Sequence, residues 1–338
     1  MGLQIGDIVA RKEISFSELK GRTIAIDAFN VIYQFLTSVR QPDGTPLMDS
    51  HGRITSHLSG LLYRNVALLS EGISLIYVFD GEYHHLKEKT HELRQEAKDK
   101  MVEKYEDAVE EEDIEGMGKY SKGFSRIDNE MIAESKELLE AMGIAVCQAP
   151  GEGEMQAAEL VRSGQAWAVG SQDYDALVVG GTRLIQNLTL ARKRKTVSGF
   201  IYIAPEIIEF EGVINQLGIT WDQLICLAIL VGTDFNPKGV RGIGPKKALA
   251  LVKQFVYPVK IFENVIERHG DIGFNWREIF EIFKKPNVSK HKVTFPKFDE
   301  DKIKEILVSK HEFSLERIDN QIAKLREVYA KKGQMRLF

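Results

Sequence analysis

Short runs of β-branched and apolar residues recur along the chain, and each run leads to an acidic residue. The runs are "TIAID", "ISLIYVFD", "GIAVCQAPGE" and "AWAVGSQD", which lead to Asp27, Asp80, Glu152 and Asp173. Most of them stand next to a segment with helical spacing, and this alternation predicts βα units and a mainly parallel sheet. Sites in open sheets of this kind form outside the carboxyl ends of the strands. We therefore expect four acidic features at one edge of one sheet.

Three segments have the apolar spacing of helices. "SHLSGLLYRNVALLS" (residues 56–70) carries leucines and a valine near helical spacing, and "NEMIAESKELLEAMG" does the same up to Gly143, a natural helix terminator. "WDQLICLAILVGTD" is almost wholly apolar until Gly232. This third segment is predicted to be a buried helix.

Residues 84–126 are highly charged, with nine Lys or Arg and twelve Asp or Glu. Such a segment buries little apolar surface, so we expect a solvated helical insertion that orders when a partner binds. The alternative is an exposed helical hairpin without a role. Its start directly after Asp80 argues for a connection with the acidic edge.

Residues 235–260 contain six Lys or Arg and no acidic residue. Within them, "GVRGIGPKKALALV" combines a turn at Gly242 and Gly244 with Pro245, which suits the first position of a helix. Backbone N–H groups at such a helix start bind phosphate, and they read no bases. The segment therefore predicts an element that grips a nucleic-acid backbone. An ordinary helix–turn–helix with lysines in solvent is the alternative.

Seven carboxylates fall at predicted strand ends and loops. Like charges brought this close raise one another's pKa and destabilise the fold unless cations neutralise them. Carboxylates without cysteine or paired histidine select Mg²⁺ or Mn²⁺, and two such ions roughly 4 Å apart suit in-line phosphodiester hydrolysis. Taken singly, each acid also has an ordinary role, as a helix-start acid or a turn cap. The seven acids are Asp27, Asp80, Glu152, Glu154, Asp173, Asp175 and Asp234.

The composition narrows the classes of protein that remain possible. The net charge is 45 − 49 = −4, which does not exclude nucleic-acid binding because the positive charge is clustered. The two cysteines, Cys147 and Cys226, indicate a reducing compartment without a disulfide framework or a cysteine zinc site. We expect no signal peptide and no membrane span. Gly6 in place of Ser or Thr excludes N-myristoylation.

Eight strings give the chain a resemblance to the flap endonucleases of the structure-specific 5′ nuclease family. They run in family order almost from end to end: "IAIDAFNVIYQFL", "DGTPLMD", "GRITSHLSGLLYR", "YVFDGE", "QAPGEGEMQAA", "SQDYDALVVG", "LAILVGTDFNPKGVRGIGPKKAL" and "HEFSLERI". The resemblance implies an α/β fold of the PIN-like type, in which a mixed, mostly parallel sheet lies between helices. It implies cleavage near the base of a 5′ flap, with 5′→3′ exonuclease activity, in Okazaki-fragment maturation and long-patch base excision repair.

The resemblance also implies residue roles. The seven acids would hold two Mg²⁺ ions, which Mn²⁺ could replace. Lys87 and Arg94 would contact the scissile phosphate from the base of a helical arch, and their spacing of seven places them on one helix face. Without the resemblance, a solvated helix face would be the better reading of these two.

Further positions match residues that contact DNA. Tyr33 would stack near the scissile nucleotide, although it could also be a core residue. Thr55 and Arg317 would form a pocket for a one-nucleotide 3′ flap. The "VRGIGPKK" turn would grip downstream duplex and bind K⁺. The implied contacts with duplex, junction or turn are Arg40, Arg64, Gly232, Arg241, Gly242, Gly244, Lys246 and Lys247.

Two positions depart from the family pattern. His84 and His85 follow "FDGEY" where prolines are frequent, and we do not assign them as metal ligands. At the end of the chain, Gln334 and Leu337 match a sliding-clamp motif that Phe338 leaves incomplete. Clamp binding is therefore expected only from a partial motif. The missing basic tail and the abundant Lys and Glu favour an archaeal, cytoplasmic protein over a nuclear, eukaryotic one. We also expect a monomer.

The expected organisation has five parts. They are an N-terminal nuclease region (1–100), an arch insertion (81–130), an internal nuclease region (117–260) with the helix–turn–helix at 235–255, a C-terminal helical region (261–329) and a partial clamp-binding tail (330–338). Three other functions stay open at this point: a PIN-like ribonuclease, a catalytically silent junction binder, and a phosphatase built on an Asp-x-Asp motif. The basic turn speaks against the first and third, and the complete acid set speaks against the second.

Overall fold

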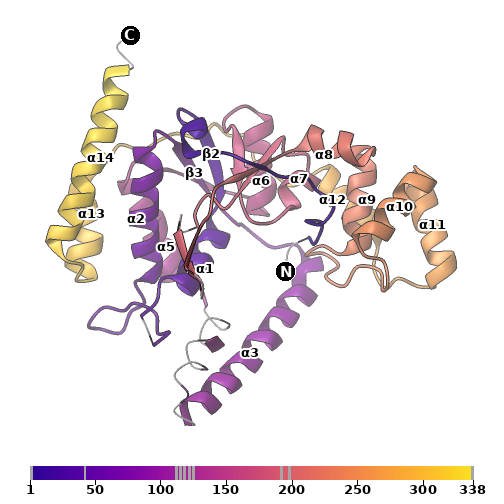
Figure 1. The fold of residues 1–338 in the computed structure, drawn as a ribbon, viewed down its shortest axis with the longest axis horizontal. Coiled ribbons are helices and arrows are strands. Elements are labelled where there is room, and N and C mark those ends of the chain that lie inside the picture. Colours follow the sequence, from indigo (N-terminus) through magenta and orange to yellow (C-terminus); the bar gives the residue numbers. More distant parts are fainter. Residues whose placement is uncertain are drawn as a thin grey trace.

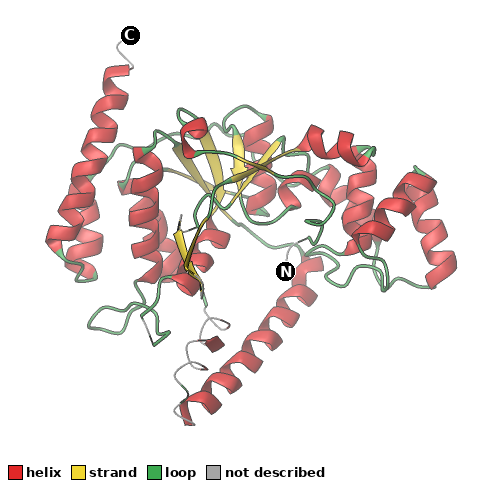
Figure 2. Ribbon diagram, viewed as in Figure 1, coloured by secondary structure: helices red, strands yellow, loops and turns green. Residues whose placement is uncertain are grey.

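The central sheet lies between two sets of helices in the computed structural model of the chain (Figures 1 and 2). The structure describes residues 3–41, 43–110, 113, 116, 119–120, 123, 126–190, 193–196 and 199–335. The helix α3 (Glu88–Glu110) extends away from the body of the molecule (Figure 1). It confirms that the charged segment after Asp80 is helical over this range.

The main sheet has seven strands in the order β1-β9-β6-β5-β2-β3-β4. Its neighbours from β6 to β4 run parallel, whereas β9 runs antiparallel to both β6 and β1. The predicted mixed, mostly parallel sheet is therefore confirmed. The strands are β1 (Lys12–Glu13), β2 (Thr23–Asp27), β3 (Ser74–Phe79), β4 (Ala145–Gln148), β5 (Ala168–Gly170), β6 (Arg183–Gln186) and β9 (Glu206–Glu209).

Strand β2 lies at the point where the strand order reverses. Its neighbour β3 continues the sheet towards one edge, and β5 continues it towards the other. Clefts at such a switch point, at the carboxyl ends of the strands, are where open α/β sheets bind ligands. A separate hairpin pairs β7 (Lys193–Thr196) with β8 (Gly199–Tyr202).

Alternating side chains of the strands supply two hydrophobic cores. Ile24, Ile26 and Tyr77 face one core, while Ala25 and Ile76 face the other. The first core is covered by α1 (Ala28–Ser38), α2 (Ser56–Ser70), α5 (Asn129–Ala141), α13 (Glu300–Lys304), a π-helical turn (Glu305–Lys310) and α14 (Leu315–Met335). The second is covered by α6 (Gly153–Arg162), α7 (Asp175–Val178), α8 (Phe210–Leu217), α9 (Trp221–Val231), α10 (Pro245–Phe255), α11 (Pro258–His269) and α12 (Trp276–Lys284).

The helix limits follow local chemistry. Asp128 caps α5 by accepting from the backbone N–H of Met131, and the chain leaves this helix at Gly143, whose φ of 75° suits glycine. Thr220 and Gln223 form a capping box at the start of α9, which is buried from Gln223 to Leu230 and so confirms the predicted buried helix. Among the described residues, no single helix is long and apolar enough to cross a membrane. The bent pair α8 and α9 passes that test only when taken together, across an angle of 83°.

The expected regions are interleaved in space. Strands of the N-terminal region (β2 and β3) pair with strands of the internal region (β4 and β5), so the two contribute to one sheet. The expected boundary at residue 260 falls inside α11, and the one at residue 329 falls inside α14. The region limits therefore stay predictions, whereas the shared sheet is observed.

Candidate active site

Four strand ends and one buried helix bring the seven acids to one edge of the sheet. Asp27 ends β2, Asp80 follows β3, and Asp173 follows β5. Glu152 and Glu154 lie at the start of α6, Asp175 begins α7, and Asp234 follows α9. Mutual electrostatic effects link all seven carboxylates. The sequence-based grouping is confirmed as a spatial cluster, which we call the carboxylate cluster.

The backbone of β2 and α1 orients the first acid. Asp27 caps α1, because its Oδ1 accepts the backbone N–H of Asn30 at 3.1 Å. The Asn30 side-chain amide also donates to Asp173 Oδ2 at 3.4 Å. Asn30 therefore connects the acids of two strands. The spacing of Asn30, three residues after an N-cap acid, is a signal that could have identified it from the sequence.

Gly153 explains the acid–glycine–acid string at the start of α6. Its N–H donates to Asp80 Oδ1 at 2.6 Å, and a Cβ added at Gly153 would lie only 2.6 Å from the same oxygen. A side chain at this position would therefore push Asp80 away. The glycine lets Asp80 approach the positive end of α6, between the two glutamates.

Ser171 is a cluster residue that the sequence analysis missed. Its hydroxyl donates to Glu154 Oε1, and its oxygen accepts the backbone N–H of Asp173 at 3.1 Å. One small side chain thus joins acids from α6 and from the β5–α7 loop. Its position two residues before Asp173 in "SQDYD" was the only sequence signal.

Two basic side chains neutralise one side of the carboxylate cluster. Lys87 forms ion pairs with Glu152 and, at 3.4 Å, with Asp234. Arg94 donates to both carboxylate oxygens of Asp234 at 2.8 Å each. The two residues do not share one helix as predicted, because Lys87 lies in the short 3₁₀ turn (His85–Lys87) and Arg94 in α3, but both reach Asp234.

Burial dominates the ionisation of the carboxylate cluster. It raises the pKa of Asp27 to about 7, with Asp80 adding to the effect, and it raises the pKa of Asp175 to about 7, with Asp234 and Asp173 adding. The pKa of Glu154 is raised well above its ordinary value by burial first and then by Asp173.

Asp234 behaves in the opposite way. Burial acts to raise its pKa, but Lys87 and Arg94 outweigh burial and hold the pKa below its ordinary value. Burial likewise acts to lower the pKa of Lys87, while Glu152 and Asp234 raise it overall. On the side of the carboxylate cluster away from these two cations, the raised pKa values of Asp27, Glu154 and Asp175 show that nearby positive charge does not balance the acids.

The donor set fits divalent cations of the Mg²⁺ class. It consists of carboxylate oxygens, with raised pKa values that report uncompensated negative charge. Lys87 and Arg94 lie where positive charge is favoured. Within the described ranges, the carboxylates form no group of three whose ligand atoms all lie within 4.8 Å of one another. The side chains therefore have to close in around an ion.

Comparisons with known proteins identify the family. The XPG N-terminal domain matches residues 3–101, and the XPG I-region matches residues 143–234. The chain is 46% identical to "Flap endonuclease 1" of Aeropyrum pernix over 98% of this chain and 96% of that protein. It is 47% identical to "Flap endonuclease 1" of Saccharolobus solfataricus over 96% and 94%.

The chain belongs to the flap endonuclease family. Its structure matches that of the flap endonuclease-1 of Methanococcus jannaschii with a TM-score of 0.77 and 40% identity, over 98% of this chain and all of that one. The catalytic core of Rad2 in complex with DNA substrate, at 22% identity and a TM-score of 0.70, shares the fold. The resemblance inferred from the sequence is confirmed, and the family consists of metal-dependent nucleases that act on DNA.

The turn between α9 and α10, which is predicted to bind phosphate in this flap endonuclease family member, contains two open glycines. A Cβ added at Gly242 or Gly244 would meet nothing within 4 Å, so both backbones face open space. Gly244 caps α10, Pro245 is its first residue, and Lys247 donates to the Gly242 carbonyl at 3.0 Å. Arg241, Lys246 and Lys247 are exposed.

Gly232 lies at the end of α9, where the chain enters this turn. Its φ is 116°, and an added Cβ would lie 2.9 Å from the backbone nitrogen of Gly239. Asn236 holds the turn together by accepting from the Thr233 hydroxyl at 2.7 Å and donating to the Ile229 carbonyl at 2.7 Å. The glycine at position 232 is thus required by backbone packing.

The other residues predicted to contact DNA in this family member lie on or directly beside α1, α2 and α14. Tyr33 is 37% exposed, which agrees with a stacking role better than with a core role. Arg40 donates to the carbonyls of Leu36 at 2.8 Å and Gly44 at 2.7 Å, so it supports its own loop. Arg64 is half-buried on α2.

Thr55 is buried and Arg317 is exposed, and their two segments are fastened together. His311 bonds Asp49 Oδ2 at 3.0 Å, and Ser50 donates to Glu312 through its N–H at 2.8 Å. These bonds hold together the segments that carry Thr55 and Arg317. The 3′-flap pocket itself stays a prediction. Of the clamp-motif residues, Gln334 lies in α14, while Leu337 and Phe338 lie outside the described residues.

Proposed function

We propose that the protein is a structure-specific 5′ nuclease that hydrolyses DNA at the base of 5′ flaps and also degrades 5′ ends exonucleolytically. One observation carries the proposal: the carboxylate cluster lies at the switch point of the sheet, with Lys87 and Arg94 on its rim. Okazaki-fragment maturation and long-patch base excision repair produce such flaps. The two sequence relatives reported above are both named flap endonuclease 1, and that name supports these roles.

Two divalent ions would be held by the carboxylate cluster, Mg²⁺ in the first place with Mn²⁺ able to replace it. The buried acids with raised pKa values would exchange their protons for metal. When bound, such ions lower the pKa of the attacking water and stabilise charge on the scissile phosphate and leaving oxygen. Asn30, Ser171 and the N–H of Gly153 would orient the carboxylates, because each already donates to one of them.

Lys87 and Arg94 would bind the phosphate that is cut. Both now share Asp234, and a phosphate that reaches the edge of the sheet competes for the same two cations. Their charges would then stabilise the negative charge that develops on the phosphate oxygens during hydrolysis. The 3₁₀ turn and the start of α3 would therefore place positive charge beside the acids.

The duplex would be gripped away from the site of chemistry. The exposed cations and open glycines of the α9–α10 turn suit contact with a phosphate backbone. We also propose that a K⁺ ion binds at this turn. Tyr33 would stack on a base at the junction, Thr55 and Arg317 would hold a 3′ flap, and Arg40 and Arg64 would lie along the duplex. None of these contacts reads a particular base, which suits an enzyme that recognises branch structure.

The proposal also covers the binding partner of the protein, its oligomeric state and its location in the cell. A sliding clamp would bind weakly through Gln334, Leu337 and Phe338, and the protein would act as a monomer. The relatives named above are archaeal, which supports a place in the cytoplasm of an archaeal cell.

The test is a cleavage assay with Mg²⁺ on three labelled substrates: a double-flap DNA, a blunt DNA duplex and a single-stranded RNA. Preferential cutting of the flap within a few nucleotides of its junction is expected. Preferential cutting of RNA would instead identify a ribonuclease. Tight binding of flap DNA without any cutting would identify a silent junction binder.

A further inference from the structure

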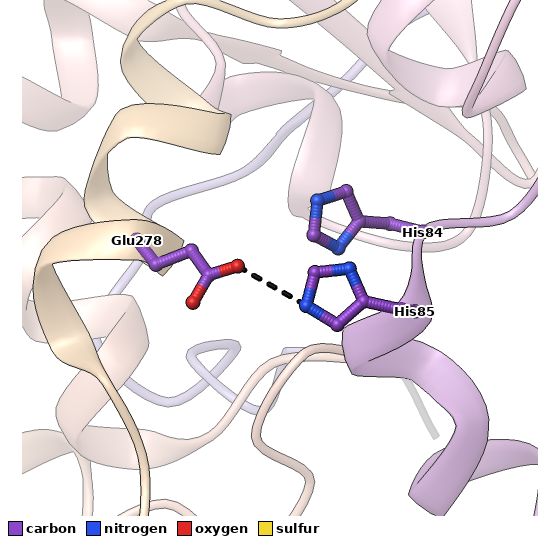
Figure 3. A group of neighbouring side chains, drawn as sticks. All are labelled: His84, His85 and Glu278. Atoms are coloured by element: carbon purple, nitrogen blue, oxygen red, sulfur yellow. Dashed lines mark ion pairs between the residues drawn. The ribbon is translucent and has the colours of Figure 1, made fainter.

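Two histidines and a glutamate converge beside the carboxylate cluster (Figure 3). His84 caps the 3₁₀ turn before α3, His85 begins that turn, and Glu278 lies in the first turn of α12. The possible ligand atoms of the three side chains all lie within 4.8 Å of one another. Within the described ranges, no other group of three histidine, cysteine or acidic side chains meets this distance.

Packing around Phe235 holds the two elements in place. The ring of His84 meets Phe235 edge to face at 6.0 Å, and Phe235 meets Phe283 of α12 edge to face at 5.5 Å. The histidine rings lie with their centroids 4.3 Å apart, and both extend towards Glu278 (Figure 3). The 3₁₀ turn and α12 therefore keep their spacing because both pack on one buried aromatic ring.

The distances suit a small tetrahedral ion. Zinc lies about 2.0–2.2 Å from nitrogen and oxygen ligands, so the edge between two ligands of a tetrahedron is about 3.3 Å. His85 Nε2 and Glu278 Oε1 are 3.2 Å apart. His84 Nδ1 accepts the N–H of Leu86 at 3.3 Å, a long hydrogen bond that ion binding would exchange for a metal–nitrogen bond. Small side-chain rotations would bring in the third ligand.

The donor types separate this group from the carboxylate cluster. Two imidazoles and one carboxylate favour zinc, copper, nickel or cobalt, whereas carboxylate oxygens alone favour Mg²⁺ or Mn²⁺. Three protein ligands leave one position for water, and the exposure of His85 (65% for its side chain) gives solvent access. A cavity of about 490 Å³ is lined by both His84 and Glu278 and extends to Glu152.

We propose that His84, His85 and Glu278 bind one divalent transition-metal ion of the zinc class. The ion fastens the 3₁₀ turn at the base of α3 to α12. Lys87 lies three residues after His84, so the ion holds the segment that carries this phosphate-binding lysine. The sequence analysis did not assign the two histidines to a metal. Glu278 lies 193 positions from His85, and no spacing in the sequence signals that they meet.

The test uses Co²⁺ as a spectroscopic probe on the full chain. Mg²⁺ is kept in large excess so that the carboxylate cluster is saturated. The wild type is expected to bind one equivalent of Co²⁺ with the strong visible absorption of a four-coordinate ion, and Zn²⁺ is expected to bleach that signal. His85→Ala and Glu278→Gln should each weaken Co²⁺ binding by about tenfold or more, because loss of even an outer partner of a metal ligand costs about 10- to 100-fold.

Two matched variants serve as controls. Glu281→Gln removes a carboxylate one turn further along α12 that pairs with Lys285, and His269→Ala removes an exposed histidine of α11. Both should bind Co²⁺ as the wild type does. Wild-type binding in His85→Ala and Glu278→Gln, or no absorption change in the wild type, would overturn the proposal. The readout is independent of DNA cleavage, so its failure would leave the proposed nuclease function intact.

Discussion

Asp175→Asn should make the metal-free protein more stable while it abolishes cleavage. Asp175 is half-buried, and its Oδ1 is buried without a hydrogen-bond partner among the described residues. Burial, together with Asp234 and Asp173, raises its pKa from 3.8 to about 7. An asparagine has the same shape and carries no charge to desolvate. The carboxylate is therefore a stability cost that function retains.

The magnitude follows from the pKa shift. The unfolded chain releases the proton near pH 3.8, whereas the folded chain keeps it up to about pH 7. Between these values a rising pH favours the unfolded state, because the folded state binds more protons. At 1.36 kcal/mol for each pH unit, the cost is absent below pH 3.8, about 2 kcal/mol at pH 5, and levels off near 4 kcal/mol above pH 7. Coupling to neighbouring acids makes about 4 kcal/mol an upper value.

The assay is urea denaturation in EDTA at pH 5, 6, 7 and 8, with Asp107→Asn, an exposed acid of α3, as the control. The advantage of Asp175→Asn over the wild type should grow from pH 5 to pH 7 and then level off. Saturating Mg²⁺ should stabilise the wild type more than the variant. An advantage that is absent at pH 8, or that does not change with pH, would refute the reasoning.

Three further variants test other parts of the site. Lys87→Ala should slow single-turnover flap cleavage by about 10²- to 10³-fold, with little change in the dissociation constant for DNA, and an unchanged rate would remove Lys87 from phosphate binding. Lys246→Ala should weaken binding to flap and plain duplex alike and lower the slope of log K against log salt by about one unit, whereas Lys324→Ala on α14 should leave the slope unchanged. Gly153→Ala should destabilise the protein by about 1–3 kcal/mol and impair cleavage, because its Cβ would lie 2.6 Å from Asp80 Oδ1. In contrast, Gly212→Ala on α8, where the nearest atom is 3.8 Å away, should be neutral or slightly stabilising in thermal denaturation, and equal effects of the two glycine variants would contradict the packing argument.

Much of the site could be predicted because it lies on strand ends. Short continuous apolar runs, followed by acids, place Asp27, Asp80 and Asp173 at one edge of any parallel sheet that the runs form. The helix that starts at Gly153 was likewise readable from its first turn. These features depend on neighbours within a few residues, so local patterns carry them.

Contacts between distant segments could not be predicted in this way. Ser171 meets Glu154 across 17 residues, and Thr90 donates to the Asp234 carbonyl across 144. Arg40 shows the converse, because the family resemblance implied a DNA contact while its guanidinium also supports the loop at Gly44. Which atoms a long polar side chain reaches depends on how helices pack, and periodicity does not contain that information.

The sequence by itself determined the sheet type, the acids at its edge and the basic turn after α9, since each follows from local spacing and composition. Only the tertiary structure decided that Lys87 lies between Glu152 and Asp234, and that α12 brings Glu278 to His85. The physical reason is that strand order and helix packing are settled by burial of the two hydrophobic cores as wholes. This packing positions the residues that meet in the site. The sequence around each of them therefore does not show which distant residue it contacts.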